Sequence, residues 1–255
     1  MRFACLGSGS RGNALIVESG RTRLMLDCGY PAKETERRLA RLGLAAADLA
    51  GIVVTHEHSD HTAGACKFAR KHGLALWLTH GTLKGLPGDA SAVPAINIID
   101  SHSPFAVGDL QLLPFPVPHD AREPAHFVFS DGARRLGVLT DTGAPTGHIE
   151  AMLSGCDALV LECNHDLDML MHGDYPQALK ERVAGRYGHL DNQSAADLLS
   201  ALDCSRLQHL IAAHLSQQNN TPALACTALA QAMGCAPGWI GVADQDEGFA
   251  WREIV

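Results

Sequence analysis

Three histidines and one aspartate stand within six residues of the chain, and this segment is the strongest chemical signal in the sequence. The run Thr55-His56-Glu57-His58-Ser59-Asp60-His61 follows Gly51-Ile52-Val53-Val54, an apolar segment typical of a buried strand. His56 and His58 are spaced to bind one cation, and Asp60 and His61 to bind a second one about 3.5–4 Å away. A solvated histidine-rich loop is the alternative, but the segment is short and its residues follow a chelating order.

Two cations need more ligands than this loop supplies, and polar residues at three other strand ends are candidates. His119 follows the predicted strand at Leu110–Val117, and Asp141 ends the apolar run Leu136-Gly137-Val138-Leu139-Thr140. His214 follows Leu210-Ile211-Ala212-Ala213. Rigid strands often present functional side chains at their ends, so these residues are predicted to converge with the loop at one sheet edge. Taken singly, each is also compatible with a strand-end cap or a hydrogen-bonded histidine.

The elements that must position these residues are mainly short strands. Apolar runs rich in Val, Ile and Leu predict strands at Arg2–Leu6, Ala14–Glu18, Arg23–Asp27, Gly51–Thr55, Leu74–Leu78, Ile96–Ile99, Leu110–Val117, Ala125–Ser130, Arg134–Thr140, Ala158–Glu162, Gln208–Ala213 and Phe249–Ile254. Helices are predicted at Pro31–Leu42, Ala63–His72, Pro145–Leu153, Tyr175–Tyr187, Ser194–Leu202 and Pro222–Met233. Two β-rich halves with helices outside fit this pattern, in a single domain spanning residues 1–255.

Composition restricts the class of protein. The 255-residue chain has a formal charge of −8, which argues against a nucleic-acid binder held by bulk charge alone. It has no apolar run long enough to span a membrane and no apolar core of a signal peptide near its start, so we expect a cytoplasmic protein without a membrane partner. None of the eight cysteines forms a CxxC pair, and most lie in apolar runs, which indicates reduced, buried thiols. The 14 histidines outnumber the 13 Trp, Tyr and Phe residues together, which again points to metal.

The order His56-x-His58-x-Asp60-His61, then His119, Asp141 and His214, resembles the metallo-β-lactamase superfamily. That resemblance implies an α+β fold, a four-layer αββα sandwich with two divalent metal ions at one edge. It implies a first site of His56, His58 and His119, a second site of Asp60, His61 and His214, and Asp141 as the bridging ligand. Zinc is the expected metal, and manganese is the alternative.

Further motifs are similar to the YycJ/WalJ branch of this superfamily. They are Leu6-Gly7-Ser8-Gly9-Ser10-Arg11-Gly12-Asn13, Leu24-Met25-Leu26-Asp27, Glu162-Cys163-Asn164-His165-Asp166, Gly188-His189-Leu190-Asp191-Asn192 and Ala213-His214-Leu215-Ser216-Gln217-Gln218-Asn219-Asn220. The branch implies a metal-dependent phosphodiesterase, a DNA 5′-exonuclease with a role in DNA repair that uses a metal-bridging hydroxide. A thioester or lactone hydrolase of the glyoxalase II kind stays open, because that branch shares Asp141, and so does a non-catalytic or redox metal-binding module. True class B β-lactamases carry Cys where this chain has Asp141, which argues against antibiotic hydrolysis.

Several residues are candidates for contact with substrate. The loop from Gly7 to Asn13 could bind a phosphate through its backbone N–H groups and through Ser8, Ser10 and Asn13, although a plain hairpin turn is equally compatible. Asn164 is a second candidate, because it follows the strand Ala158–Glu162. With Asp60, the predicted catalytic residues are His165 and His189, either of which could protonate the leaving group. Asp27 could orient a ligand histidine or cap a turn.

Overall fold

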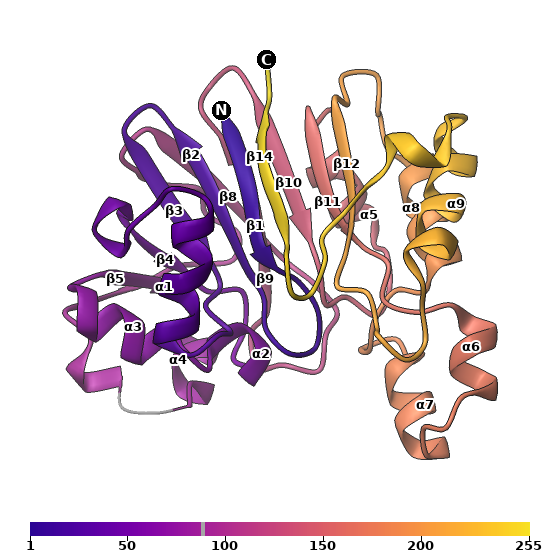
Figure 1. Cartoon of the computed structure of the whole chain (residues 1–255), viewed down its shortest axis with the longest axis horizontal. Helices are drawn as coiled ribbons and strands as arrows, with labels where there is room; N and C mark the ends of the chain where they lie inside the picture. Colours follow the sequence, from indigo (N-terminus) through magenta and orange to yellow (C-terminus); the bar gives the residue numbers. More distant parts are fainter. Residues whose placement is uncertain (88–89) are drawn as a thin grey trace.

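Two seven-stranded sheets form the centre of the computed structural model, which describes residues 1–87 and 90–255 (Figure 1). The first sheet has the order β14-β1-β2-β3-β4-β5-β6. Its strands are β1 (Arg2–Gly7), β2 (Ala14–Ser19), β3 (Thr22–Leu26), β4 (Gly51–Val53), β5 (Ala75–Leu78), β6 (Ala95–Ile98) and β14 (Phe249–Glu253). β3 to β6 run parallel to one another, whereas the pairs β14·β1, β1·β2 and β2·β3 are antiparallel.

The second sheet repeats this mixed arrangement with the order β13-β12-β11-β10-β9-β8-β7. Its strands are β7 (Phe105–Val107), β8 (Leu110–Pro116), β9 (Ala125–Ser130), β10 (Arg135–Leu139), β11 (Ala158–Glu162), β12 (His209–Ala213) and β13 (Gly241–Val242). β10 to β13 are parallel, and β7 to β10 pair antiparallel. The carboxyl ends of β10, β11 and β12 therefore lie at one edge, where parallel sheets usually bind ligands.

Helices cover the outer face of each sheet. α1 (Ala32–Arg41) and α3 (Ala65–His72) lie outside the first sheet, and α5 (Gly147–Leu153), α8 (Asn192–Ala201) and α9 (Pro222–Met233) lie outside the second (Figure 1). The shorter elements are α2 (Ser59–Thr62), α4 (His80–Gly85), α6 (Leu167–His172), α7 (Gln177–Val183) and the 3₁₀ turns Ala46–Asp48, Ala90–Ala92 and Pro237–Trp239. The predicted four-layer αββα sandwich of the α+β class is confirmed.

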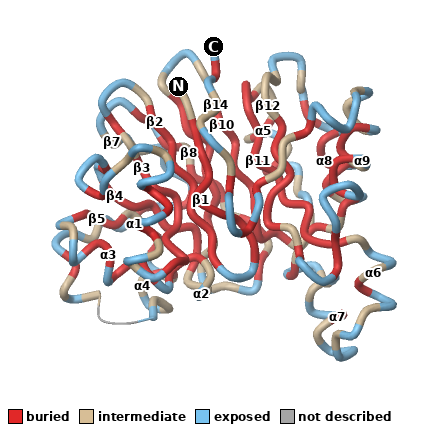
Figure 2. The backbone as a smooth tube through the Cα atoms, viewed as in Figure 1, coloured by how far each residue is buried: buried red, intermediate tan, exposed pale blue. Residues whose placement is uncertain are grey.

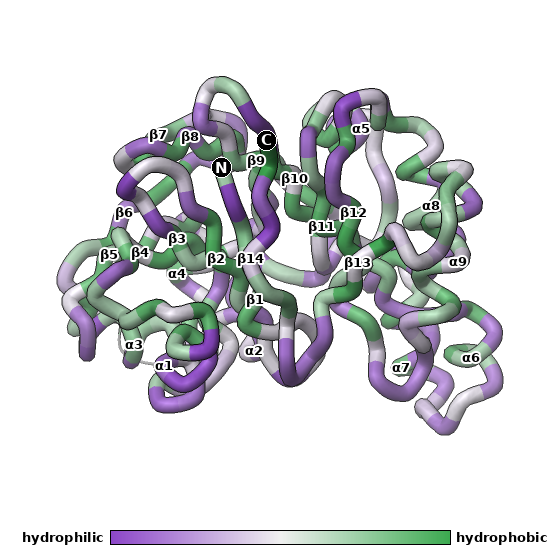
Figure 3. The backbone as a smooth tube through the Cα atoms, turned by 45° about the horizontal axis from the view of Figure 1, so that its top comes forward, coloured by the Kyte–Doolittle hydropathy of each residue, from purple (hydrophilic) through white to green (hydrophobic). Residues whose placement is uncertain are grey.

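Alternation along the strands explains why the layers stack. In β11, Ala158 and Val160 pack between the two sheets, whereas Leu159 and Leu161 face the helices of the second half. Each sheet is thus buried on both faces, and three apolar cores separate four layers. Figure 2 shows buried residues along most of the strands, and Figure 3 shows hydrophobic residues concentrated on strands such as β11 and β12.

The structure corrects several predicted boundaries. The predicted helix Tyr175–Tyr187 is only α7, because the chain leaves helical geometry after Ala184 and turns at Gly185 and Gly188. The predicted helix Ala63–His72 begins at Ala65 as α3. The sequence prediction lacked β7, β13, α4 and α6, whose runs of two to six residues carry too little periodicity. Within the described ranges, we find no helix with the length and apolar character that crossing a membrane requires.

Candidate metal centre

Strained backbone at strand ends turns the site residues inward. Asp27 follows β3 with φ 61°, Asp141 lies just beyond β10 with φ 50°, and His214 follows β12 with φ 55°. Non-glycine residues rarely adopt positive φ, and the conformation costs about 1–3 kcal/mol unless the surroundings enforce it. In the described part of the chain these three are the non-glycine residues with positive φ; Asp141 and His214 belong to one group of candidate ligands, and Asp27 contacts His61 of the same group. This concentration of strain indicates a functional site.

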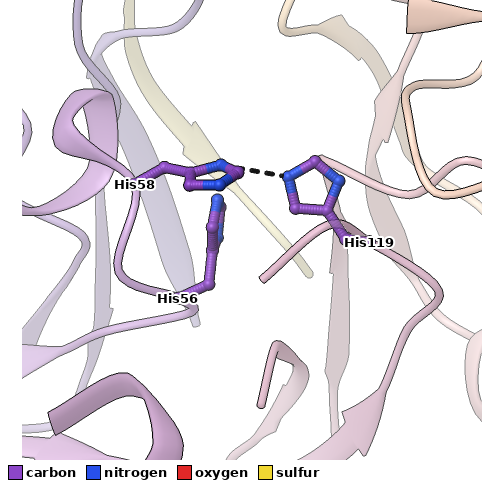
Figure 4. A group of neighbouring side chains, drawn as sticks. All are labelled: His56, His58 and His119. Atoms are coloured by element: carbon purple, nitrogen blue, oxygen red, sulfur yellow. Dashed lines mark hydrogen bonds between the residues drawn. The ribbon is translucent and has the colours of Figure 1, made fainter. Parts of the chain in front are cut away.

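The first cluster consists of three histidines from two loops. His56 and His58 come from the loop between β4 and α2, and His119 comes from the loop after β8 (Figure 4). The three offer ligand nitrogens that all lie within 4.8 Å of one another, with His58 Nδ1 3.2 Å from His119 Nε2. His56 Nε2 is buried and has no hydrogen-bond partner in the described chain. A cation would satisfy this nitrogen, so the cluster fits the predicted first metal site.

The second cluster consists of Asp60, His61, Asp141 and His214, whose ligand atoms also lie within 4.8 Å of one another. His61 Nε2 is 3.1 Å from Asp141 Oδ2 and 3.4 Å from Asp60 Oδ2, and His214 Nε2 is 3.4 Å from Asp60 Oδ2. Asp141 also lies 4.0 Å from His119 of the first cluster. All seven predicted ligands therefore meet at one edge, and the position of Asp141 between the clusters suits a bridging ligand.

The other ring nitrogen of four of the five histidines faces an acceptor. His61 Nδ1 lies 2.8 Å from Asp27 Oδ2, and His119 Nδ1 lies 3.0 Å from the Gly188 carbonyl oxygen. His214 Nδ1 lies 3.1 Å from Glu162 Oε1, and His56 Nδ1 lies 3.0 Å from the Thr55 hydroxyl. Contacts of this kind fix the ring and leave the opposite nitrogen for a metal. The predicted contact between Asp27 and a ligand histidine is confirmed.

The electrostatics of the cluster favour a cation. Burial disfavours charge on Asp141, but His214 and His61 outweigh it and hold the pKa of Asp141 well below its ordinary value. Burial likewise opposes charge on His214, but Asp141, Asp60 and Glu162 raise its pKa to about 10. The Asp141 carboxylate is thus ionised and attracts positive charge, which divalent ions would supply in place of protons.

The comparisons with known proteins agree with this geometry. A family model described as "Beta-lactamase superfamily domain" matches residues 22–214. The chain belongs to the metallo-β-lactamase superfamily. It is 34% identical over 239 residues to exodeoxyribonuclease YycJ of Bacillus anthracis, covering 91% of this chain and 89% of that protein. It is 30% identical over 248 residues to exodeoxyribonuclease WalJ of Streptococcus pneumoniae serotype 2, covering 94% of this chain and 91% of that protein.

The comparison with solved structures shows the same fold. The metallo-β-lactamase fold protein YhfI from Bacillus subtilis aligns with a TM-score of 0.74 at 15% sequence identity, over 98% of each chain. The resemblance of the sequence to the superfamily and to its YycJ/WalJ branch is confirmed, and the protein is a hydrolase of this superfamily with a His/Asp cluster suited to two metal ions.

Glu162 is the residue of this superfamily site that sequence reasoning missed. It ends β11, is fully buried, and accepts hydrogen bonds from the backbone N–H groups of Thr142 and Leu190 at 3.0 and 3.1 Å. Its other oxygen lies 2.9 Å from His189 Nδ1 and 3.1 Å from His214 Nδ1. An acidic residue at the end of a wholly apolar strand was the available signal, the same one that pointed to Asp141.

The structure separates the predicted substrate residues into two groups. Ser10, Asp60 and His189 line an open pocket of about 390 Å³ over the cluster, together with His58, Ser59, Asp120, Asp141, Tyr175, Leu179, Arg182, Val183, Gly188 and His214. Ser8, Asn13, Asn164 and His165 are buried and are not in that lining. The second group therefore lies beneath the superfamily site and not at its surface.

Three of these buried residues hold metal-cluster residues in place. Ser8 Oγ accepts a hydrogen bond from the His214 backbone N–H at 3.0 Å, and Asn164 Nδ2 donates to the His214 carbonyl at 3.0 Å. Asn13 Nδ2 lies 3.3 Å from Asp60 Oδ2. The side chains of Ser8 and Asn13 thus have protein partners, and their predicted phosphate contact stays a prediction. His165 is fully buried with Nδ1 3.3 Å from Asn164 Oδ1, so its predicted proton transfer to a leaving group is not supported.

Proposed function

We propose that this hydrolase is a dinuclear metal-dependent deoxyribonuclease that removes nucleotides from the 5′ ends of DNA. The observation that carries the proposal is its similarity, over nearly the whole chain, to two bacterial proteins named exodeoxyribonuclease. The intact pair of ligand clusters supports it, because cleavage of phosphodiesters is a reaction in which two-metal sites excel. The proposal includes a role in DNA repair and a cytoplasmic location, where buried thiols such as Cys28 and Cys163 stay reduced.

The ligands of the two ions are part of the proposal. His56, His58 and His119 would hold the first ion, and Asp60, His61 and His214 the second, with Asp141 shared. Five imidazoles and two carboxylates suit zinc, and manganese is the alternative. Bound divalent ions would lower the pKa of water toward neutrality and offset the charge of the phosphate.

The chain itself supplies a candidate proton donor. His189 lines the pocket, and its Nδ1 faces Glu162, so Nε2 is the nitrogen left for a departing oxygen. Burial opposes charge on His189, but Glu162 outweighs it and raises the pKa of the imidazole above its ordinary value. A protonated ring is what protonation of the leaving group requires. We therefore assign this step to His189, with Glu162 as the residue that orients it.

The pocket lining supports a charged substrate over an apolar one. Aspartate, histidine, serine and arginine side chains make up most of the lining, with Leu179 and Val183 on one side only. A thioester or lactone hydrolase with a hydrophobic acyl chain needs a larger apolar surface. A redox module would instead show the visible absorbance of iron in the protein as purified, before zinc is added.

The test offers the zinc-loaded protein 5′-labelled and 3′-labelled DNA, the matching RNA, and a thioester. The proposal expects mononucleotides released from the 5′ end of DNA and little turnover of the thioester. His58→Ala should abolish this activity, whereas His102→Ala should keep it, because His102 is exposed and outside both clusters. Turnover of only the thioester, or digestion from the 3′ end, would contradict the proposal.

A further inference from the structure

One wall of the pocket is formed by α7 and the residue pair before it. Tyr175, Leu179, Arg182 and Val183 all line the pocket. Leu179 lies four positions after Tyr175, and Arg182 and Val183 lie three and four positions after Leu179, which is the spacing of residues on one helix face. α6 and α7 project from the sandwich beside the site and are largely exposed (Figures 1 and 2). None of these four lining residues belongs to the two ligand clusters.

The α7 wall is tied to the metal centre by hydrogen bonds. The loop that follows α7 folds back against the end of this helix, where the His189 backbone N–H donates to the Val183 carbonyl at 2.9 Å. The Gly188 carbonyl accepts from His119 Nδ1 at 3.0 Å, and the Tyr187 carbonyl accepts from the Asp120 backbone N–H at 3.0 Å. The wall therefore has a fixed position relative to the first ligand cluster.

The charge of the pocket makes Arg182 distinctive. It is the one lysine or arginine among the lining residues, all of which lie in the described ranges, and the same lining contains the carboxylates of Asp60, Asp120 and Asp141. Its Nε donates to Asp120 Oδ2 at 2.7 Å, and its terminal guanidinium nitrogens have no hydrogen-bond partner within the described part of the chain. The Arg182 side chain is 62% exposed, and an ion pair this exposed rearranges at little cost.

We propose that the α7 wall binds the nucleotide adjoining the scissile phosphate, with Arg182 on a phosphate oxygen and Tyr175 stacked on the base. This inference rests on the proposed function and names the residues that hold its substrate. A guanidinium matches phosphate geometry through two parallel N–H groups, and aromatic rings stack on any base without reading its sequence. The pocket volume of about 390 Å³ lies within the range of small-ligand sites.

Mononucleotide binding separates this role from a structural one. We would measure the affinity of the metal-loaded protein for thymidine 5′-monophosphate and for thymidine by calorimetry. Arg182→Gln should weaken binding of the monophosphate about tenfold or more, leave thymidine unchanged, and be partly rescued by Arg182→Lys. Tyr175→Leu should weaken both ligands, and Tyr175→Phe neither. Arg186→Gln removes an equal charge outside the pocket and should change neither.

Asp120→Asn distinguishes binding from bracing. Asp120 Oδ1 lies 3.5 Å from His119 Nε2 and 3.8 Å from His58 Nε2, so the ion pair could instead support these ligands. If the ion pair only supports the metal ligands, Arg182→Gln and Asp120→Asn should both reduce the metal content. The proposal instead predicts that Arg182→Gln keeps both ions and that Asp120→Asn still binds the nucleotide. In DNA hydrolysis, Arg182→Gln should raise KM with kcat changed little. A lower kcat at unchanged KM in Arg182→Gln, or loss of metal from this variant, would overturn the inference. If the unmodified protein binds the monophosphate but does not cleave DNA, only the proposed function is overturned.

Discussion

Glu162 allows a direct test of how the protein sets the tautomer of a ligand histidine. Its Oε1 lies 2.9 Å from His189 Nδ1 and 3.1 Å from His214 Nδ1, and its Oε2 accepts from the backbone N–H groups of Thr142 and Leu190. The carboxylate thus faces four donors. Glu162→Gln keeps the shape of the side chain but replaces one acceptor oxygen with an NH₂ group, which can only donate.

Each orientation of the new amide has a measurable consequence. If the amide oxygen stays on the two backbone donors, its NH₂ group faces His214 Nδ1, which must then accept and carry its proton on Nε2. Since Nε2 is the nitrogen proposed to bind the second ion, metal affinity should fall about 10–100-fold, or roughly 1.4–2.8 kcal/mol. The opposite orientation would leave two buried N–H donors unsatisfied, at about 1–3 kcal/mol each in the free energy of unfolding. We expect the first orientation.

The assay is a chelator competition for zinc, combined with urea unfolding of the metal-free protein. Glu162→Gln should show one weakened ion and an unfolding midpoint close to that of the parent. Glu150→Gln on α5 is the control, because it removes a carboxylate that belongs to neither cluster. If Glu162→Gln binds both ions as tightly as the parent and is equally stable, the tautomer argument is wrong.

Three further predictions concern stability. Burial lowers the pKa of His126 to about 3, and both of its ring nitrogens lack a hydrogen-bond partner in the described chain. Between pH 6.5 and pH 5 this histidine takes up a proton in the unfolded state but not in the folded state, so the free energy of unfolding of the parent should fall by about 2 kcal/mol. With a chelator present to keep the protein free of metal, His126→Leu should abolish this decrease in the free energy of unfolding. A variant with the same pH dependence of stability as the parent would contradict the prediction. Hydrogen bonds from Arg37 and Arg38 lower the pKa of Glu34 to about 2. In urea titrations, Glu34→Gln should therefore lower the free energy of unfolding by at most about 1 kcal/mol at pH 7, and this difference from the parent should disappear as the pH falls from 4.5 to 2. A Cβ at Gly188 would overlap the Val183 carbonyl oxygen of α7, so Gly188→Ala should lower the free energy of unfolding by about 1–3 kcal/mol. An unchanged thermal midpoint would contradict this close contact.

Much of the site was predictable because its residue types stand out against apolar strands. His119, Asp141 and His214 each follow a run of buried residues, and parallel strands bring such ends together. The sandwich was predictable for the same reason, since alternation such as that in β11 requires a layer on each face. Residue type and strand period are both visible without coordinates.

The direction of a side chain beyond a strand end was not predictable. Asn164 and His165 follow β11 much as His214 follows β12, yet His165 turns into the interior and Asn164 braces a neighbouring loop. Glu162 was missed because its partners His189 and His214 lie 27 and 52 positions away, and their approach depends on how two loops pack. The local sequence around Glu162 carries no information about which residues of distant loops will contact it.

The central claim is that two ions held by the paired clusters are needed for exonuclease activity. The most direct measurement adds zinc stepwise to metal-free protein and records bound ions per chain together with the release of 5′-terminal nucleotides from DNA. The account predicts that activity follows the second bound ion, and that His56→Ala and His214→Ala each retain one ion without activity. Full activity with one ion or fewer per chain would contradict it.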